Sequence, residues 1–570
     1  MIVFRAKMPY TKIPNTVCCC AAWRTGSVVI AAVLAAALIG CGMDRQKAAA
    51  QADEQVYGII ENQWQDSLGS RADYRIDRGA QSLNSEILPR VCEKGAMTLS
   101  EAVQLAVWAS PEFQTAREQL YLVGLDQTEA EHLYDITPFA SAAAGQTMVR
   151  NTTSSSARPY ENEIRGGQGT AGIQKLLATG ALLTTDLTLG SFDVVSGNYR
   201  TGGASLFQAA ITQPLLRGAD RKVVLETLTQ AQRNTLYQIR SFNRFRKTFT
   251  VSVVSDYYRL MEYALRVRFA RENIQQLEQL YQKMQHLSQF GFVAQHELEE
   301  TRQDILKAED TFAQTQRLYR EMLDLFKLRL LIPPDVDIEP EAAEWLALED
   351  FGRCEIQMTE QRAIEAAQFQ RLDLANMSDQ VEDSYRHIDV AADALKMDLS
   401  VVGVASPASR GRMTFGADPG DLQRTQERYE LSLRADFAMD RLLERNNYKR
   451  ALIALSQQQR AHQQLTDQVI AEVRKAWRDM EEARQRSLLQ TSAKKLAQQR
   501  LDTTLLLMQH ARANTRDVLR AQEDYYSAQE GYVTAMTDFA VAKMNFLRDT
   551  EMLWVHPDGG YTIHAVSKAE

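Results

Sequence analysis

The residues that could carry catalytic chemistry do not stand at catalytic spacings. His296-Glu297 begins like the helix of a zinc protease, but Leu-Glu-Glu follows and the second histidine of such a site is missing. The glycine-rich stretch Gly166-Gly167-Gln168-Gly169 lacks the Lys-Ser or Lys-Thr pair that ends a phosphate-binding loop. The eight histidines are scattered, and we find no nucleophile motif. The sequence therefore predicts no enzyme, no metal site and no cofactor.

A cysteine at position 41 is the residue best placed for covalent modification. The 40 residues before it contain four bases and no acid, and residues 28–39 form an apolar run of 12. Such a run is too short for a membrane-spanning helix, which needs about 20 apolar residues. This pattern predicts a secretory signal over 1–40, with an uncleaved membrane anchor as the alternative. Leu38-Ile39-Gly40-Cys41 resembles a lipobox, which implies a covalent lipid on Cys41 as the mature N-terminus. Gly42 in place of Asp implies the outer membrane by the same resemblance.

The charge of the chain argues against a nucleic-acid partner. The formal net charge is −8, and removal of the four basic residues of the leader gives −8 − 4 = −12. A nucleic-acid-binding surface would need a basic patch.

Beyond position 41 only two cysteines remain, Cys92 and Cys354. A disulfide between them is compatible with an oxidising compartment, but their spacing does not establish it.

An internal repeat is the strongest feature of the chain. Residues 97–113 align without gaps with 358–374 at an offset of 261, and later segments align at an offset of 220. The matched pairs include Ala102 with Ala363, Trp108 with Phe369, Asp220-Arg221 with Asp440-Arg441, Glu297 with Asp517, and Phe326 with Phe546. The difference, 261 − 220 = 41 residues, lies in a Gly-, Ser- and Thr-rich region between about 135 and 205 of the first copy.

Each copy reads as helix, strand region, long helix, break and last helix. The expected helices are about 99–133 and 360–394 with N-caps at Thr98 and Thr359, then 221–290 and 441–510, then 297–331 and 517–551. Apolar positions 465, 469, 473, 476, 480 and 483 step by three or four, which is one stripe on the long helix. Two short helices, placed end to end, match one long helix in length and can bury this stripe. An elongated coiled-coil spacer would show the same periodicity.

Alternating segments argue against a purely helical spacer. Residues 429–437 place Tyr429, Leu431, Leu433, Ala435 and Phe437 on one face and polar residues on the other; segments 397–401 and 183–189 alternate likewise. These segments suit a transmembrane β-barrel, with an ordinary half-buried sheet as the alternative. Two strands per copy make four per chain, whereas the smallest barrels have about eight, so several chains would share one barrel. Residues 176–192 read as a hairpin around Ala178-Thr179-Gly180. We expect it to extend above the membrane; the alternative is that 168–192 adds strands to the barrel.

Four segments together resemble the TolC-like outer-membrane efflux protein family. They are LSEAVQLAVWASPEFQTAREQL (99–120), ITQPLLRGADRK (211–222), FGFVAQHEL (290–298) and RDVLRAQEDYYSAQEGY (516–532), and the resemblance covers roughly 97–553. It implies a mainly α fold with a β-barrel: a homotrimer whose three chains form a 12-stranded barrel in the outer membrane, continued by a long periplasmic α-helical barrel. It also implies an exit duct that joins an inner-membrane pump through a periplasmic adaptor.

The expected organisation of the chain follows from the repeat and the resemblance. It comprises a signal peptide (1–40), a lipidated N-terminal segment (41–96), a first repeat (97–334, strands about 136–213, tip near 290–297), a linker (335–357), a second repeat (358–553, strands about 396–437, tip near 510–517) and a C-terminal tail (554–570).

The resemblance also implies roles for residues at the breaks before the last helices, which form the periplasmic tip of the duct. The adaptor-contact element falls on Phe290, Gly291 and Phe292 in the first copy and on His510, Ala511 and Arg512 in the second. The gate acids fall on Glu297 and Asp517, while Arg520 stands where the family has another acid. Asp517 and Arg520 are three apart, so they can pair on a helix. A solvated charge at a helix end is the alternative for each.

A second function class shares many of these features. A non-transporting coiled-coil scaffold lipoprotein, tethered to the outer membrane, would also have the lipobox and the helices. The alternating strands distinguish the two, because a scaffold has no use for them. The transported substrate and the class of pump cannot be deduced from the sequence.

Overall fold

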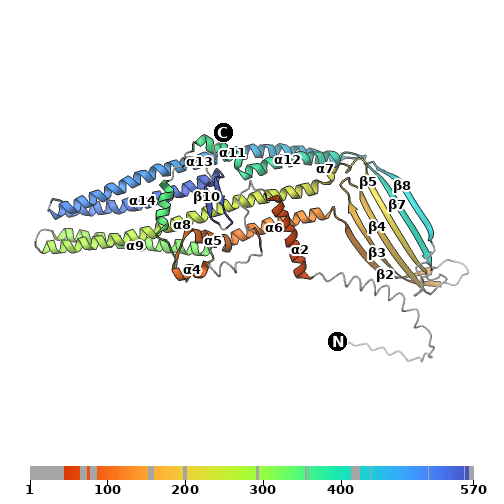
Figure 1. Ribbon diagram of the computed structural model, residues 1–570, viewed down its shortest axis with the longest axis horizontal. Helices are drawn as coiled ribbons and strands as arrows, with labels where there is room; N and C mark the ends of the chain where they lie inside the picture. Colours follow the sequence, from red (N-terminus) through yellow and green to blue (C-terminus); the bar gives the residue numbers. More distant parts are fainter. Residues whose placement is uncertain are drawn as a thin grey trace, which may run out of the picture. The chain divides into compact units, whose positions relative to one another are not determined.

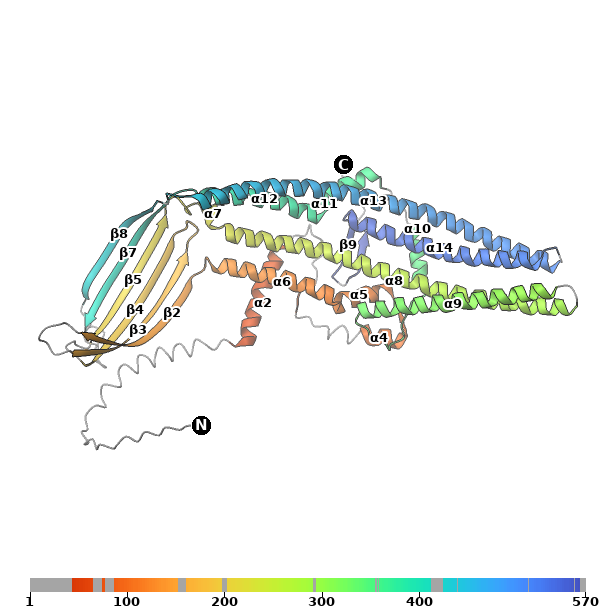
Figure 2. The same cartoon turned by 180° about the vertical axis from the view of Figure 1, so that it is seen from behind.

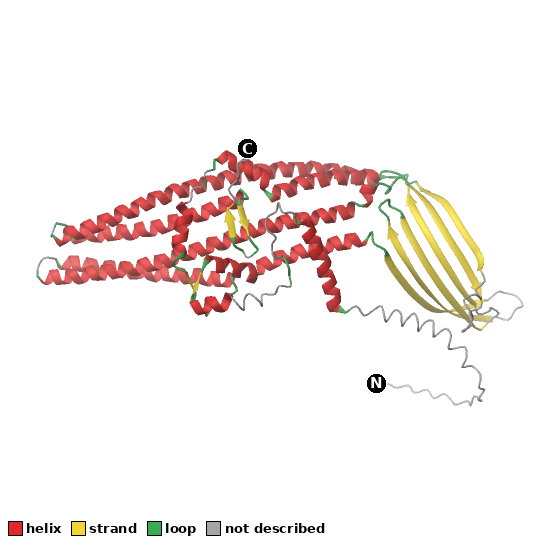
Figure 3. Cartoon of the chain, in the orientation of Figure 1, coloured by secondary structure: helices red, strands yellow, loops and turns green. Residues whose placement is uncertain are grey.

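A computed structural model describes residues 44–64, 74–76, 87–151, 160–196, 202–290, 294–353, 356, 358–411, 424–437, 439–510, 512–557 and 559–563. The chain divides into two compact units, and each unit takes segments from both sequence repeats. The strand unit comprises Met1–Glu54, Thr128–Thr229 and Ile388–Lys449; the helical unit comprises Gln55–Gln127, Gln230–His387 and Arg450–Glu570. Figure 3 distinguishes the helices from the strands. Cys41, the expected signal segment and Cys354 lie outside the described residues, and Cys92 is a free, exposed thiol.

The helix bounds reproduce the two sequence offsets. The helices are α2 (Arg45–Gln63), α4 (Ile87–Lys94), α5 (Leu99–Ala109), α6 (Pro111–His132), α7 (Arg221–Val224), α8 (Glu226–Gln289), α9 (Gln295–Arg329), α10 (Glu344–Arg353), α11 (Glu360–Gln370), α12 (Leu372–Asp393), α13 (Leu442–Gln509) and α14 (Thr515–Asp549). Both ends of α5 and α6 differ by 261 from those of α11 and α12, and both ends of α9 differ by 220 from those of α14. Leu331 and Glu551, also 220 apart, are the two non-glycine residues with positive φ in the described chain (53° and 59°). The two copies therefore share their backbone turns as well as their helices.

Local signals explain where the first helices begin. The Thr98 hydroxyl accepts the N–H of Glu101, whose carboxylate accepts the N–H of Thr98, so a capping box starts α5. Thr359 caps α11 through the N–H of Arg362. Both expected N-caps are confirmed.

Each first helix, expected to be continuous, is in fact two. Ser110 is extended because a proline, Pro111, follows it and disfavours the helical region for the residue before it. Pro111 then occupies the first position of α6, where no N–H is required. The second copy breaks at the matching residue, Arg371, without a proline.

The predicted apolar stripe of the long second-copy helix lies in a core of the helical unit. Val469, Val473, Ala476 and Met480 are buried, and Leu465 and Ala483 pack at the margin of the same cluster. The larger core surrounds α8, where Phe242, Phe249 and Tyr257 are almost fully buried. No described helix has the length and apolar character needed to cross a membrane. Figures 1 and 2 both show α8 beside α9 and α13 beside α14.

Short strands complete the helical unit. β1 (Ala96–Met97) pairs in parallel with β6 (Glu339–Pro340), and β9 (Leu553–Val555) pairs antiparallel with β10 (Tyr561–Ile563). The first pair joins the start of the first repeat to the segment between the repeats.

The strand unit holds one antiparallel sheet of six strands. In sheet order these are β2 (Thr137–Asn151), β3 (Tyr160–Leu176), β4 (Leu182–Ser196), β5 (Gly202–Pro214), β7 (Asp398–Gly411) and β8 (Arg424–Asp436). The first repeat thus supplies four strands and the second two. The expected four strands per chain are therefore wrong: the described sheet has six.

The additional residues of the first repeat explain the difference. β3 and β4 form the expected hairpin around Ala178-Thr179-Gly180, but the hairpin pairs with β2 on one side and β5 on the other. It therefore lies within the sheet and does not extend beyond it, because its alternating residues find backbone partners on both sides. Gly180, with φ +77°, sits in the turn, where a Cβ would collide with the Gly218 carbonyl oxygen.

Candidate functional site: an amphipathic sheet and the helix tips

One face of the sheet is apolar and exposed. Directly paired residues of an antiparallel sheet lie on the same face, and Leu183 pairs with Ile211, Ile211 with Gly403, and Gly403 with Leu431. The exposed large apolar residues on this face are Ile173, Leu183, Leu187, Leu189, Phe207, Ile211, Tyr429, Leu431 and Leu433. Leu431 is 82% exposed. Such a contiguous apolar surface marks a site for lipid or for another protein surface.

The opposite face is largely polar. Gln174 pairs with Thr184, and the hydroxyls of Thr170 and Thr188 are 2.9 Å apart across β3 and β4. Asp186, Gln208, Glu430, Ser432 and Arg434 lie on the same face. The alternation expected for 183–189 and 429–437 is therefore confirmed: in these two segments the large apolar side chains share one face of the sheet and the opposite face carries polar side chains.

Both edges of the sheet are open within the described chain. β2 and β8 are the terminal strands, and neither has a second neighbour among the described strands. Five antiparallel steps separate them, so they run in opposite directions. Unpaired edge N–H and C=O groups form a template for pairing with another chain.

The second candidate region is the pair of helix tips in the helical unit. Phe290, at the end of α8, is 74% exposed, and His510 and Arg512, which follow α13, are also exposed. Gly291, Phe292 and Ala511 lie outside the described residues. The structure thus places three of the six expected adaptor-contact residues on an accessible surface.

The expected gate acids have different partners. Glu297, in the first turn of α9, accepts a 2.9 Å hydrogen bond from the Thr515 hydroxyl at the start of α14. Asp517 accepts the N–H of Asn514 at 3.3 Å, so it stabilises the first turn of its own helix. No ion pair joins Asp517 to Arg520, both of which are described, so the pairing expected from their spacing is absent.

Arg520 instead lines a polar groove of about 390 Å³ between α8, α9 and α14. In this groove the Arg516 guanidinium makes two 3.1 Å hydrogen bonds to the Glu300 carboxylate. This bond lowers the pKa of Glu300, and Arg520 contributes to the same effect through its charge. Lys307 and Glu523 form a second pair across the groove at 3.1 Å.

Sequence reasoning missed Glu300 and Arg516, although the offset of 220 held the signal. Position 300 corresponds to 520, and 296 corresponds to 516. Glu300 thus corresponds to Arg520, whereas Arg516, which bonds Glu300, corresponds to His296. The offset identifies these equivalent positions, but only the packing of α9 against α14 shows that the opposite charges meet.

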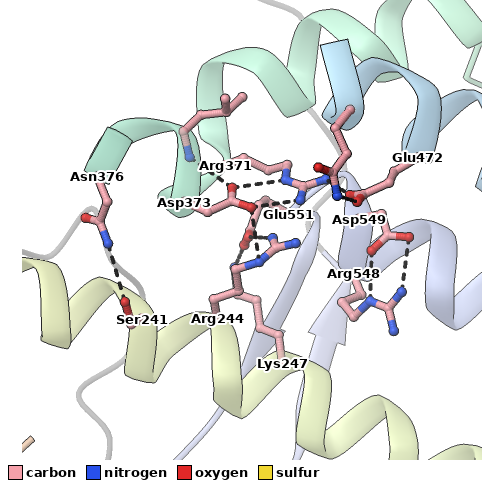
Figure 4. Close-up of polar contacts among 12 residues, drawn as sticks. Ser241, Arg244, Lys247, Arg371, Asp373, Asn376, Glu472, Arg548, Asp549 and Glu551 are labelled. Carbon is pink, nitrogen blue, oxygen red and sulfur yellow. Dashed lines mark hydrogen bonds and ion pairs between the residues drawn. The ribbon is translucent and has the colours of Figure 1, made fainter. Parts of the chain in front are cut away.

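A largely buried charge network within the helical unit was also missed. Arg371, 3% exposed, makes a two-pronged contact with Asp373 (3.1 and 2.8 Å) and a 2.8 Å bond to Glu472 on α13 (Figure 4). Arg244 on α8 bonds Glu551 at 3.1 Å, and Lys247 bonds the same carboxylate. Arg244 also lies 3.5 Å from the Asp373 carboxylate, so the set joins α8, the α11–α12 junction, α13 and the turn after α14.

The network controls the ionisation of its acids. Burial alone would raise the pKa of Asp373, but the Arg371 guanidinium holds it below the ordinary value. Burial and Arg371 oppose each other in the same way at Glu472, whose pKa is also lowered. No group of three or more His, Cys, Asp or Glu residues in the described part of the chain is arranged to hold a metal ion.

Comparison with known proteins identifies the fold. No family model matches the sequence, and no curated protein matches it. Among solved structures, the outer-membrane channel OprN aligns with a TM-score of 0.56 at 12% identity, over 86% of this chain and 96% of that one. The CmeC outer membrane channel of Campylobacter jejuni gives 0.54 at 11% identity, over 87% and 92%. The outer membrane protein VceC of Vibrio cholerae gives 0.55 at 11% identity, over 79% and 95%. The chain therefore has the fold of these outer-membrane proteins.

Proposed function

We propose that this chain is the outer-membrane exit duct of a tripartite efflux or secretion system. Three copies form a passive channel whose strands lie in the outer membrane and whose helices lie in the periplasm. The channel joins an inner-membrane pump through a periplasmic adaptor. A lipid on Cys41 provides an additional anchor in the outer membrane.

The observation that carries the proposal is the amphipathic, six-stranded sheet with its exposed apolar face and two open edges. A sheet can span a membrane only if its edges are paired, because unsatisfied backbone groups are costly in lipid. Six strands are too few for a closed barrel, since the smallest have about eight. Pairing of the edges with other copies satisfies both requirements. The likeness to proteins named as outer-membrane channels supports the same reading.

The helix tips support the proposed coupling to an adaptor. Phe290 is exposed at the end of α8, and His510 and Arg512 are exposed just after α13. An exposed aromatic side chain at one tip and an exposed arginine at the other suit a protein interface, in which aromatic residues and arginine are enriched.

A coiled-coil scaffold explains the sheet less well. A scaffold held by lipid alone would gain nothing from nine large apolar side chains exposed on one face of a sheet. Those side chains would instead favour aggregation.

Conductance in planar lipid bilayers tests the proposal. Purified full-length protein should produce discrete conductance steps of uniform size after reconstitution. A scaffold would bind the bilayer without conducting, and that result would reject the channel. Adaptor coupling has its own test: a Phe290→Asp variant should conduct normally but lose co-purification with a periplasmic adaptor from the same organism.

A further inference from the structure

The hairpin of β3 and β4 has a consequence for the size of the duct. We infer that three copies of this chain close edge to edge into one barrel of 18 strands, six from each copy, with the additional hairpin as part of the wall. The inference rests on the trimer of the proposed function and specifies its architecture. The partner at each open edge is a second copy of this chain.

Strand polarity makes the two edges compatible. β2 and β8 run in opposite directions, so β8 of one copy can pair antiparallel with β2 of the next and continue the alternation around the ring. Their lengths of 15 and 13 residues are well matched. Because the interface joins one edge to the other, each copy uses both edges and the contact repeats head to tail until the ring closes.

The pairing register already contains the shear that a barrel requires. A row of directly paired residues runs from Thr137 through Gln174, Thr184, Ala210 and Val404 to Glu430. Thr137 is the first residue of β2 and lies at the same end of the sheet as Asp436, the last residue of β8. The row meets β8 at Glu430, which is 436 − 430 = 6 residues from that end. The stagger is therefore six residues over five strand-to-strand steps. At ~3.3 Å per residue and ~4.8 Å between strands, the strands tilt by about 40°. Closed barrels tilt by about 35–45°.

The additional hairpin carries the same two faces as the rest of the sheet. Ile173 and Leu187 lie on the apolar face, while Thr170 and Thr188 lie on the polar face. A hairpin that plugged the channel or stood above it would not need this continuity. Its turn at Gly180 also fits closely against Gly218, just after β5. These contacts make the hairpin a structural member of the wall.

The added strands widen the barrel. With ~4.8 Å between strands and a tilt of about 40°, 18 strands give a backbone diameter of about 36 Å and 12 strands give about 24 Å. The barrel part of this duct is therefore about half as wide again as one built from four strands per copy.

Polymer exclusion in planar bilayers measures this width. The comparison uses the full chain and a variant lacking residues 160–196, in which β2 connects directly to β5. β2 and β5 run in opposite directions. Thr137 of β2 and Ala210 of β5 belong to the same row of paired residues and lie on the same face, so the two strands can pair once β3 and β4 are removed. Graded polyethylene glycols are added to each side of the membrane in turn. The full chain should admit polymers of at least about 1.5-fold larger radius from the barrel side than the variant does, because side chains narrow both barrels by the same amount. Equal cut-offs would overturn the inference, whereas absence of conductance from both proteins would reject the proposed channel itself.

Cross-linking between copies decides the question if the deletion variant does not fold. In a Cys92→Ala, Cys354→Ala background, Ser432→Cys on β8 is combined with either Ser141→Cys or Ala143→Cys on β2. Continuing the observed stagger brings one of these positions opposite Ser432 of the neighbouring copy. One pair should give covalent species that end at three chains under oxidation. The control pair, Ser432→Cys with Thr188→Cys on the central β4, should give none.

Two outcomes of the cross-linking would overturn the inference. A ladder that ends at two chains would mean a 12-stranded ring of two copies. Failure of both edge pairs to cross-link, with conducting channels present, would mean that β2 and β8 are not neighbours.

Discussion

The hydroxyl of Thr515 donates a 2.9 Å hydrogen bond to Glu297 Oε2 and so joins the first turns of α9 and α14. These turns belong to different copies of the repeat. Removal of the hydroxyl in Thr515→Ala should cost about 1 kcal/mol of tip stability and raise the open probability of the reconstituted channel. Single-channel recording checks this. Thr504→Ala is the control, because its hydroxyl bonds only the Arg500 carbonyl of its own helix. Equal open probabilities in both variants would show that the tips do not gate the channel.

Arg520 should weaken cation selectivity at the tip. Because it stands where a second acid is expected, its charge offsets those of Asp517 and Glu300. Arg520→Asp should therefore increase cation preference and block by multivalent cations, with little change in trimer stability, since exposed charges contribute only about 0–1 kcal/mol. Reversal potentials in asymmetric salt measure the preference. Lys495→Asp is the control. Lys495 is exposed on α13 and does not line the groove, and its substitution makes the same change in net charge. An unchanged reversal potential in Arg520→Asp would show that Arg520 does not act on the permeating ions.

The two faces of β8 should respond oppositely to a new charge. Leu431→Arg places a guanidinium on the apolar face, which costs about 2–4 kcal/mol if that face meets lipid. Ser432→Arg, one residue later, places it on the polar face at little cost. We expect Leu431→Arg to reduce the heat-resistant oligomer recovered from outer membranes and Ser432→Arg to leave it near the wild-type amount. Gel analysis of membrane fractions compares them; equal recovery would contradict the lipid-facing assignment.

Arg371→Ala should strongly destabilise the helical unit. It leaves Asp373 and Glu472 without their shared partner, and a broken buried pair costs about 3–5 kcal/mol. We expect the lower end of this range, because both carboxylates retain contact with water. Arg317→Ala, which removes an exposed pair with Glu321, should change stability by less than about 1 kcal/mol. Thermal unfolding followed by circular dichroism compares the two variants.

The same network predicts a loss of stability in acid. The pKa values of Asp373 and Glu472 are lowered in the folded chain, so the folded state binds fewer protons than the unfolded state. Their contribution is complete above the unfolded values of about 4 and is lost as the pH falls through the lowered folded values. The wild-type melting temperature should therefore decrease below about pH 4, and the decrease should be smaller in Arg371→Ala. Identical pH profiles would show that Arg371 does not set these pKa values.

Lipidation of Cys41 should be visible as processing of the precursor. Globomycin, or the substitution Cys41→Ala, should leave a larger unprocessed chain, while the strands still assemble because they anchor the chain independently. Mass spectrometry of the mature N-terminus provides the check. Cleavage at another residue without an acyl group would reject the lipobox assignment.

The sequence by itself determined the repeat and most of its helices. The sequence predicted the starts of α5 and α11, the ends of α6 and α12, and both ends of α9 and α14 to within about two residues, because caps and apolar periodicity are local properties. It did not predict the breaks at Ser110 and Arg371, which divide each first helix into two. Thr98 and Thr359 were identifiable as N-caps for the same reason, since each acts on residues only three positions away. The alternation in β4 and β8 likewise predicted which residues share a face.

Only the tertiary structure decided how the strands pair and which charges meet. Alternation around Gly180 is equally suitable for a hairpin above the sheet and for two strands within it; pairing with β2 and β5 decides between them. Arg371 and Glu472 are 101 residues apart, and Arg244 and Glu551 are 307 apart. Their contacts depend on the packing of helices from both repeats, and no local pattern encodes that packing. Local periodicity fixes an element and its faces, whereas its neighbours are set by long-range burial and backbone pairing.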